Sequence, residues 1–139
     1  MDLPGESIVE SRPTRVNVLV QTGASTFVAL VCAGGAGVHA ALVPEHYEEG
    51  GIRLGGAFAV SAVLLGICAL LSSRSTGRAL PVVVLLGTAL AYLLSRTTGI
   101  PLLIDEPEEP DVLGLVTTVA EVVAAAVAAL VPHNREEDR

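Results

Sequence analysis

A single glutamate and a single histidine stand out in this sequence because each interrupts an otherwise apolar stretch. Glu121 lies near the middle of the run 112–131. If that run is a helix across a bilayer, the carboxyl group is about 14 Å below the surface, at 1.5 Å per residue from Val112. An ionised carboxylate at that depth is costly unless it is paired, hydrated or protonated, and such residues usually mark function. The alternative is a protonated structural Glu121 that donates to a carbonyl, or to Thr117 or Thr118.

His39 is the second candidate, and it falls inside the run 24–43. A neutral imidazole can donate a hydrogen bond, relay a proton or bind a metal. The alternative is a histidine that hydrogen-bonds within the packed helices and has no ligand. His46 follows seven residues later, and the two rings share a helix face only if the helix continues through Pro44.

A third candidate site combines these histidines with nearby carboxylates. His39, Glu45, His46 and Glu49 could ligate a divalent transition metal such as Zn²⁺, Cu²⁺, Mn²⁺ or Fe²⁺. The spacing matches neither HExxH nor a calcium-binding EF-hand loop. The alternative is a solvated acidic rim. Arg96 ends the run 79–95 and could pair with a rim carboxylate or complete an intramembrane polar site with Glu121 and His39.

Several function classes are disfavoured. The formal net charge of −7 argues against nucleic-acid binding. No phosphate-binding loop, dinucleotide fingerprint or nucleophile–base pattern is present, so an enzyme is not expected. Cys32 and Cys68 lie inside apolar runs and have no CxxC partner, which predicts buried thiols.

Four apolar runs must position these side chains, namely 24–43, 54–71, 79–95 and 112–131. Each is close to the length a helix needs to cross a bilayer. Half of the chain is hydrophobic (51%), and the mean hydropathy is +0.63. We therefore expect an all-α, antiparallel four-helix transmembrane bundle, with tails at 1–23 and 132–139. Small residues spaced four apart, such as Ala33 and Gly37, would allow close helix packing.

The arginines predict the orientation. Under this model, six of the eight lie in the two tails and the connection 72–78, and only Arg53 and Arg96 lie on the other side. Because basic residues favour the cytoplasm, both termini are predicted to be cytoplasmic. The opposite, outer side carries most of the carboxylates.

The two outer connections have distinct patterns. Pro44 suits the first turn of a new helix, and Gly50 and Gly51 then break it, so a short interfacial turn is expected there. The connection 96–111 holds three prolines and a run of acidic residues, which predicts an extended loop. Its apolar segment 102–104 is expected to fold back onto the end of the bundle.

Two strings support a family resemblance. The string Gly37-Val38-His39-Ala40-Ala41-Leu42-Val43-Pro44-Glu45-His46 and the segment 92–101 resemble the ends of the first and third helices in small four-span actinobacterial membrane proteins of unknown function. That group also has features similar to the acidic loop, to the helix start Leu113-Gly114-Leu115-Val116 and to Glu121 in the middle of the last helix. The resemblance implies a multi-pass protein of the bacterial cytoplasmic membrane. It marks His39, Glu45, His46, Arg96 and Glu121 without giving them roles.

Two functions remain open from the sequence. The first is a non-enzymatic accessory or assembly subunit in the lipid bilayer, which binds a membrane-protein partner or a second copy. A bundle this short is expected to leave little room for a substrate cavity, which favours that function. The alternative is metal- or proton-linked transport or sensing through a His/Glu site in the outer half of the bundle.

Overall fold

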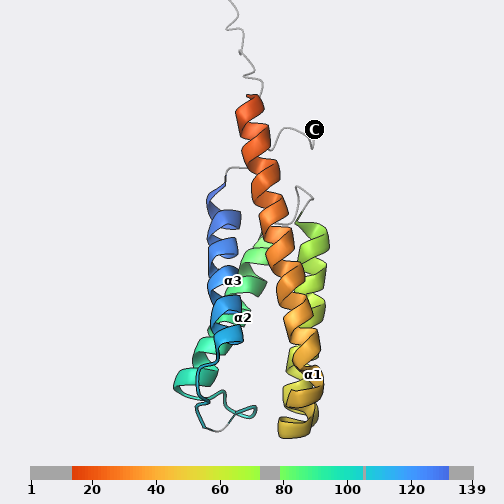
Figure 1. The fold of residues 1–139 in the computed structure, drawn as a ribbon, viewed down its shortest axis with the longest axis vertical. Coiled ribbons are helices and arrows are strands. Elements are labelled where there is room, and N and C mark those ends of the chain that lie inside the picture. Colours follow the sequence, from red (N-terminus) through yellow and green to blue (C-terminus); the bar gives the residue numbers. More distant parts are fainter. Residues whose placement is uncertain (1–13, 73–78, 105, 132–139) are drawn as a thin grey trace, which may run out of the picture.

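The computed structural model describes residues 14–72, 79–104 and 106–131. These residues form three helices, α1 (Arg15–Leu71), α2 (Ala79–Thr97) and α3 (Val112–Leu130) (Figure 1). Among the described residues the only β-type pairing is an isolated bridge between Ile100 and Ile104. The chain is therefore all-helical, as predicted, although most of residues 1–23, the connection after Ser72 and the tail 132–139 lie outside this description.

α1 reverses its direction at Gly51. This glycine has φ 65° and ψ −157°, which is not a helical conformation and is one that other residues rarely adopt. The break divides α1 into a first arm, residues 15–50, and a second arm, residues 52–71. The ring of His46 stacks on Phe58 with 3.7 Å between centroids, so the two arms lie side by side and antiparallel.

The predicted division into four separate helices is met only in part. The runs 24–43 and 54–71 belong to one element, α1, and its first arm starts at Arg15, well inside the predicted tail. Thr14 begins that arm, because its hydroxyl oxygen accepts a hydrogen bond from the Asn17 amide at 3.4 Å. α2 extends two residues beyond the predicted Ser95, and α3 ends one residue before the predicted Val131.

The prediction that a new helix starts at Pro44 is wrong, because Pro44 lies inside the continuous first arm. Proline removes one backbone donor and crowds the carbonyl four residues earlier, which normally kinks a helix. Pro44 itself is exposed, so its ring does not have to be accommodated in a packed interface. The helix ends instead at Gly51, where a positive φ is required.

The packed core fills the half of the bundle that contains the starts of α1 and α2 and the end of α3. Both arms of α1 contribute to it, together with α2 and α3. Its buried members are Val28, Cys32, Leu65, Cys68, Leu85, Ala124, Ala125 and Ala128. The three alanines of α3 are small enough for its backbone to approach the other helices closely. Ala33 and Gly37, the pair that the small-residue spacing singled out for close packing, are exposed instead.

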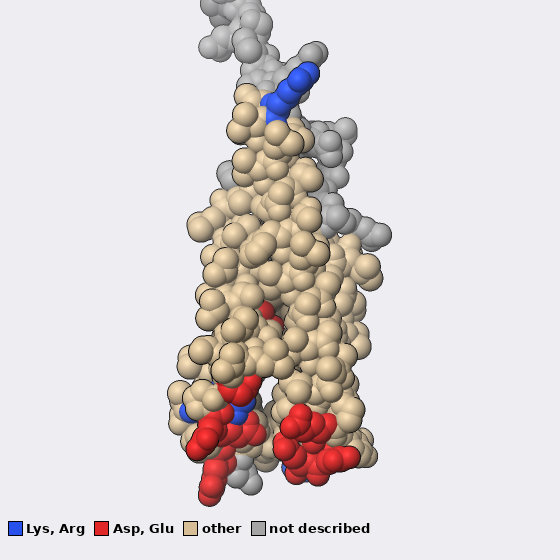
Figure 2. All heavy atoms as spheres, in the orientation of Figure 1, with Lys and Arg blue, Asp and Glu red and all other residues tan. Residues whose placement is uncertain are grey.

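The outward surface of the helices is apolar. Leu30, Val83 and Val116 are 67%, 67% and 62% exposed, one in each helix. All three helices are long and apolar enough to cross a membrane. Figure 2 shows this surface as a broad uncharged zone between the ends of the molecule. These features indicate a membrane protein whose helices contact lipid.

The two ends of the bundle differ in charge. Acidic side chains gather at the end that contains Gly51 and the connection 98–111 (Figure 2). Arg15 and the last turn of α3 lie at the opposite end, where the first arm extends beyond the other helices (Figure 1). That extension exposes Val16 (67%), Leu19 (72%) and Val20 (53%).

Candidate ligand-binding site

A cavity of about 530 Å³ occupies the acidic half of the bundle, and we refer to it as the chamber. Both arms of α1, the two other helices and the connection 98–111 line it. Figure 2 shows a hollow between two groups of acidic side chains at this end. The expectation that the bundle leaves little room for a cavity is therefore wrong. The buried alanines of α3 close the other half of the bundle, whereas this half is lined by side chains of the helices and of the connection 98–111 that leave a space between them.

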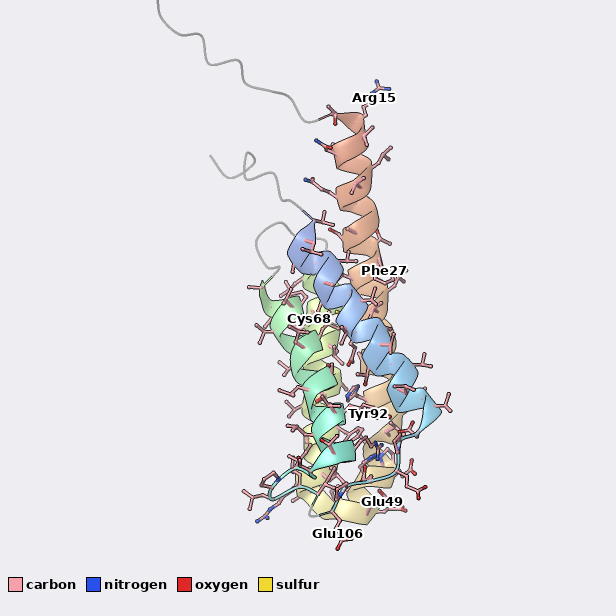
Figure 3. All side chains as sticks on the ribbon, turned by 90° about the vertical axis from the view of Figure 1, so that its left-hand side faces the viewer. Arg15, Phe27, Glu49, Cys68, Tyr92 and Glu106 are labelled. Carbon is pink, nitrogen blue, oxygen red and sulfur yellow. The ribbon has the colours of Figure 1, made fainter. Side chains whose placement is uncertain are left out.

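All six predicted site residues line this one chamber. They are His39, Glu45, His46, Glu49, Arg96 and Glu121. Glu45 and Glu49 are exposed at the mouth, whereas Glu121 is buried at the closed end. We call the exposed or half-exposed carboxylates of the mouth the acidic rim, which comprises Glu45, Glu49, Glu108, Glu109 and Asp111. Figure 3 shows labelled Glu49 at this end, with Tyr92 deeper along the bundle and Cys68 in the closed half.

Glu121 lies at the closed end, where few protein groups are placed to form hydrogen bonds with its carboxyl group. Its residue is 2% exposed, and its Oε1 has no hydrogen-bond partner among the described residues. The position is the tenth of the nineteen residues of α3. A Cβ added to Gly35 would lie 3.3 Å from that oxygen, so the carboxyl group packs closely against the first arm and would have to move by a few tenths of an ångström to admit a side chain there.

Thr88 of α2 also faces Glu121, and its hydroxyl interacts with the carboxyl group. The same hydroxyl donates to the carbonyl oxygens of Val84 and Leu85, at 3.1 and 3.0 Å. When the hydroxyl donates to either carbonyl, Thr88 Oγ1 has a lone pair that can accept from a protonated Glu121. When it turns, it can donate to the ionised carboxylate, so Thr88 suits either state of Glu121.

The two histidines have the same local geometry. His39 Nδ1 donates to the Gly35 carbonyl and His46 Nδ1 donates to the Leu42 carbonyl, both at 2.9 Å. Since each Nδ1 carries the proton of that bond, Nε2 is left to accept a proton, a hydrogen bond or a metal. Phe58 of the second arm contacts both rings, with centroids 5.5 Å from His39 and 3.7 Å from His46. Since the helix continues through Pro44, the two histidines do share a face.

The predicted metal ligands do not converge on one point. Among the described residues, no three side chains of His, Cys, Asp or Glu come together as a metal site. All four residues lie on the first arm and line the chamber. His39 and His46 are half-buried, whereas Glu45 and Glu49 are exposed at the mouth. Metal binding by these four residues stays a prediction.

Arg96 holds the mouth of the chamber together. Its two terminal nitrogens donate to Glu108 and to Asp111, the latter at 2.9 Å. The Glu108 amide donates to the Ser95 carbonyl at 2.9 Å, which fixes the connection against the end of α2. The guanidinium also lies 5.0 Å above the Tyr92 ring centroid. The predicted pairing of Arg96 with a rim carboxylate is therefore confirmed, and its grouping with Glu121 and His39 stays a prediction.

Asp111 joins this arrangement to α3. One carboxylate oxygen accepts from the Gly114 amide at 2.6 Å, as an N-cap, and the other accepts from Arg96. The Tyr92 hydroxyl donates to the Asp111 carbonyl at 3.2 Å. A Cβ on Gly114 would overlap the Tyr92 ring, so this glycine allows α3 to start directly beside α2.

The connection after α2 folds back over the mouth, as predicted for its apolar segment. Ile100 and Ile104 exchange two backbone hydrogen bonds, of 2.9 and 2.8 Å, and Gly99 turns the chain with φ 73°. Ile100, Leu103 and Ile104 line the chamber, whereas Leu102 is 80% exposed. The mouth therefore has an apolar side as well as the acidic rim.

Sequence analysis did not identify three residues of the site. Gly35 makes room for Glu121, Thr88 faces its carboxyl group, and Phe58 supports both histidine rings. Gly35 was visible only as one of several small residues, and Thr88 as the one threonine inside the third apolar run. No spacing singled out Phe58, although it is one of only two phenylalanines.

Comparison with known proteins adds no assignment to this geometry. None of the family models, curated proteins or solved structures that were compared matches this chain.

Proposed function

We propose that this chain is a multi-pass protein of the bacterial cytoplasmic membrane in which Glu121 exchanges a proton with the outer face through the chamber. Such a site would serve proton-linked transport or sensing. The observation that carries the proposal is that Glu121 Oε1 is buried at the closed end of a cavity with an exposed mouth and has no hydrogen-bond partner within the described part of the chain.

The energetics of a buried carboxyl group support this role. An ionised carboxylate in the middle of a membrane costs several kcal/mol when it is unpaired. A protonated Glu121 needs only one acceptor, and Thr88 supplies it. The chamber connects this group to the rim, so a proton or a ligand can reach it from that end.

The proposed topology has four crossings, formed by the two arms of α1 and by the two shorter helices. A helix of nineteen residues is about 28 Å long, close to the thickness of a bilayer core. The distribution of arginines in the sequence supports cytoplasmic termini, with the acidic rim and the chamber mouth outside.

Infrared difference spectroscopy of the lipid-reconstituted protein tests the proposal. Between about pH 6 and about pH 9, where exposed carboxyl groups stay ionised, the carbonyl stretch of a buried protonated carboxyl group should disappear reversibly. The Glu121→Gln variant should lack that change, and Glu109→Gln, which alters an exposed rim residue, should retain it. An identical difference spectrum in wild type and Glu121→Gln would exclude proton exchange at this position.

A second candidate function is an accessory or assembly subunit. The observation in its favour is the extension of the first arm, where Val16, Leu19 and Val20 are exposed beyond the other helices. Mild-detergent purification from native membranes should then recover a stoichiometric partner, and serine at these three positions should release it. Recovery of the monomer or a homo-oligomer alone would contradict this role.

A further inference from the structure

The chamber also has features that define the class of its ligand. Its volume of about 530 Å³ lies within the range of small-molecule sites, which is about 300–1,000 Å³. Leu42, Phe58 and Leu103 contribute apolar wall, and Ser61, Thr88 and Thr118 contribute hydroxyl groups. A ligand with an apolar body and one polar group would fit this lining.

The charge of the lining selects a cation. Six carboxyl side chains line the chamber, the five of the acidic rim and Glu121, against one arginine. Arg96 is already bound by Glu108 and Asp111, so its charge is compensated. A cleft lined by one sign of charge attracts counter-ions and repels ions of its own sign.

At the closed end, a bound cation would find one carboxyl group and few other groups that could coordinate it. Glu121 Oε1 is buried without a hydrogen bond, and its neighbours there are Gly35, Leu65 and Thr88. Calcium takes six to eight oxygen ligands, and zinc takes three or four nitrogen, sulfur or oxygen ligands. An ammonium group needs only a carboxylate and one or two further acceptors, and Thr88 is within reach.

We infer that the chamber binds a small organic monocation with an apolar body, which places its ammonium group at Glu121 and displaces the proton of that carboxyl group. This inference rests on the proposed function, because it makes the organic cation the species that exchanges with the proton. The only covalent bond that breaks is the O–H bond of the carboxyl group: its proton passes to solvent, and the resulting carboxylate forms an ion pair with the ammonium group.

Other ionisable groups near Glu121 do not compete for this role. On α1, Cys32 lies close enough to interact electrostatically with Glu121, and Cys68 is near Cys32. Both thiols are fully buried in the core. His39 is one turn from Gly35, with Nδ1 bound to the backbone. α2 presents Thr88 near Glu121, and Tyr92 and Arg96 near the mouth.

Titration calorimetry in lipid nanodiscs tests this inference with three probes of one shape, namely benzylammonium, benzyl alcohol and benzoate. Benzylammonium should bind saturably, and the alcohol and the anion at least about tenfold more weakly. Titrations in two buffers of different ionisation enthalpy should show about one proton released for each bound cation. Glu121→Gln should weaken cation binding at least about tenfold and abolish proton release, and Glu48→Gln, which alters an exposed carboxylate outside the lining, should retain both.

The outcomes separate the two proposals. Equal binding of benzyl alcohol and benzylammonium, preference for benzoate, or cation binding that Glu121→Gln leaves intact would each overturn the inference. No saturable binding of benzylammonium above that of empty nanodiscs would overturn it too. If the infrared change at Glu121 is nevertheless present, the proposed proton exchange stands and only the ligand class is wrong.

Discussion

Gly35 and Glu121 meet at the closed end of the chamber, where a Cβ on the glycine would lie 3.3 Å from the glutamate Oε1 and 3.3 Å from Leu65 Cδ1. The first arm and α3 therefore approach each other at a position where one partner has no side chain and the other has a carboxyl group. The same glycine also accepts the hydrogen bond from His39 Nδ1. One backbone position thus determines the surroundings of two candidate site residues.

This contact predicts that Gly35→Val destabilises the protein. The added methyl groups must displace either Glu121 or Leu65, and overpacking of this kind typically costs about 1–3 kcal/mol. The thermal unfolding midpoint in detergent should fall, and the carboxyl band of Glu121 should shift in the infrared spectrum. Gly34→Val is the matched control, because nothing lies within 4 Å of a Cβ at that position. Equal midpoints for the two variants would contradict the close contact.

The apolar runs predicted the helices well because every membrane-crossing helix must meet the same requirement: it has to be long and apolar enough to span the hydrocarbon core of the bilayer. α2 begins at the predicted Ala79 and α3 at the predicted Val112. The break between the first two runs was placed less well. Pro44 is a strong helix-breaking signal, yet the helix ends at Gly51, because the reversal of the chain needs a φ of 65° that glycine adopts readily.

The candidate site shows the same division. The sequence singled out six polar residues, two inside the apolar runs and four in the adjoining connections, and all six lie around one cavity. The sequence left two partners open for Arg96, a rim carboxylate or Glu121, and it could not choose between them because the pairing depends on helix rotation and on the path of the acidic connection. Arg96 illustrates this point, since its partners Glu108 and Asp111 lie 12 and 15 residues further along the chain.

The reversal in α1 predicts a large cost for a side chain at position 51. With φ 65° and ψ −157°, Gly51 occupies a region that is essentially restricted to glycine. Gly51→Ala should destabilise the fold by about 1–3 kcal/mol, measured as a lower thermal midpoint. Gly56→Ala, five residues later in the second arm, has open space for its Cβ and should have a small effect. A midpoint unchanged by Gly51→Ala would show that the arms do not turn at this residue.

The interactions of Arg96 predict local opening of the mouth when its charge is removed. Arg96→Gln leaves Glu108 and Asp111 without their cation, and the partial exposure of all three side chains limits the loss of global stability to about 1 kcal/mol. The local effect should be larger. Hydrogen–deuterium exchange should accelerate at the Glu108 amide, which donates to Ser95. Arg53→Gln, at the exposed Arg53 on the second arm, should leave that exchange unchanged.

Asp111 has two roles that substitution can separate. Asp111→Asn keeps a side-chain oxygen that can accept from the Gly114 amide, but it removes the charge that binds Arg96. Asp111→Ala removes both, so it should cost about 1 kcal/mol more, the usual value of an N-cap. Thermal midpoints should therefore fall in the order wild type, Asn, Ala. Equal values for the two variants would show that the cap contributes nothing to the start of α3.

The proposed sidedness predicts opposite labelling of two exposed positions on the first arm. Leu19→Cys lies on the extension at the end shared with the last turn of α3, and Glu48→Cys lies beside the turn at Gly51. In intact cells, a membrane-impermeant maleimide should label Glu48→Cys and should label Leu19→Cys only after lysis. The native Cys32 and Cys68 are fully buried, so the unsubstituted protein should give little background. Labelling of Leu19→Cys before lysis, with protection of Glu48→Cys, would invert the topology and place the chamber mouth in the cytoplasm.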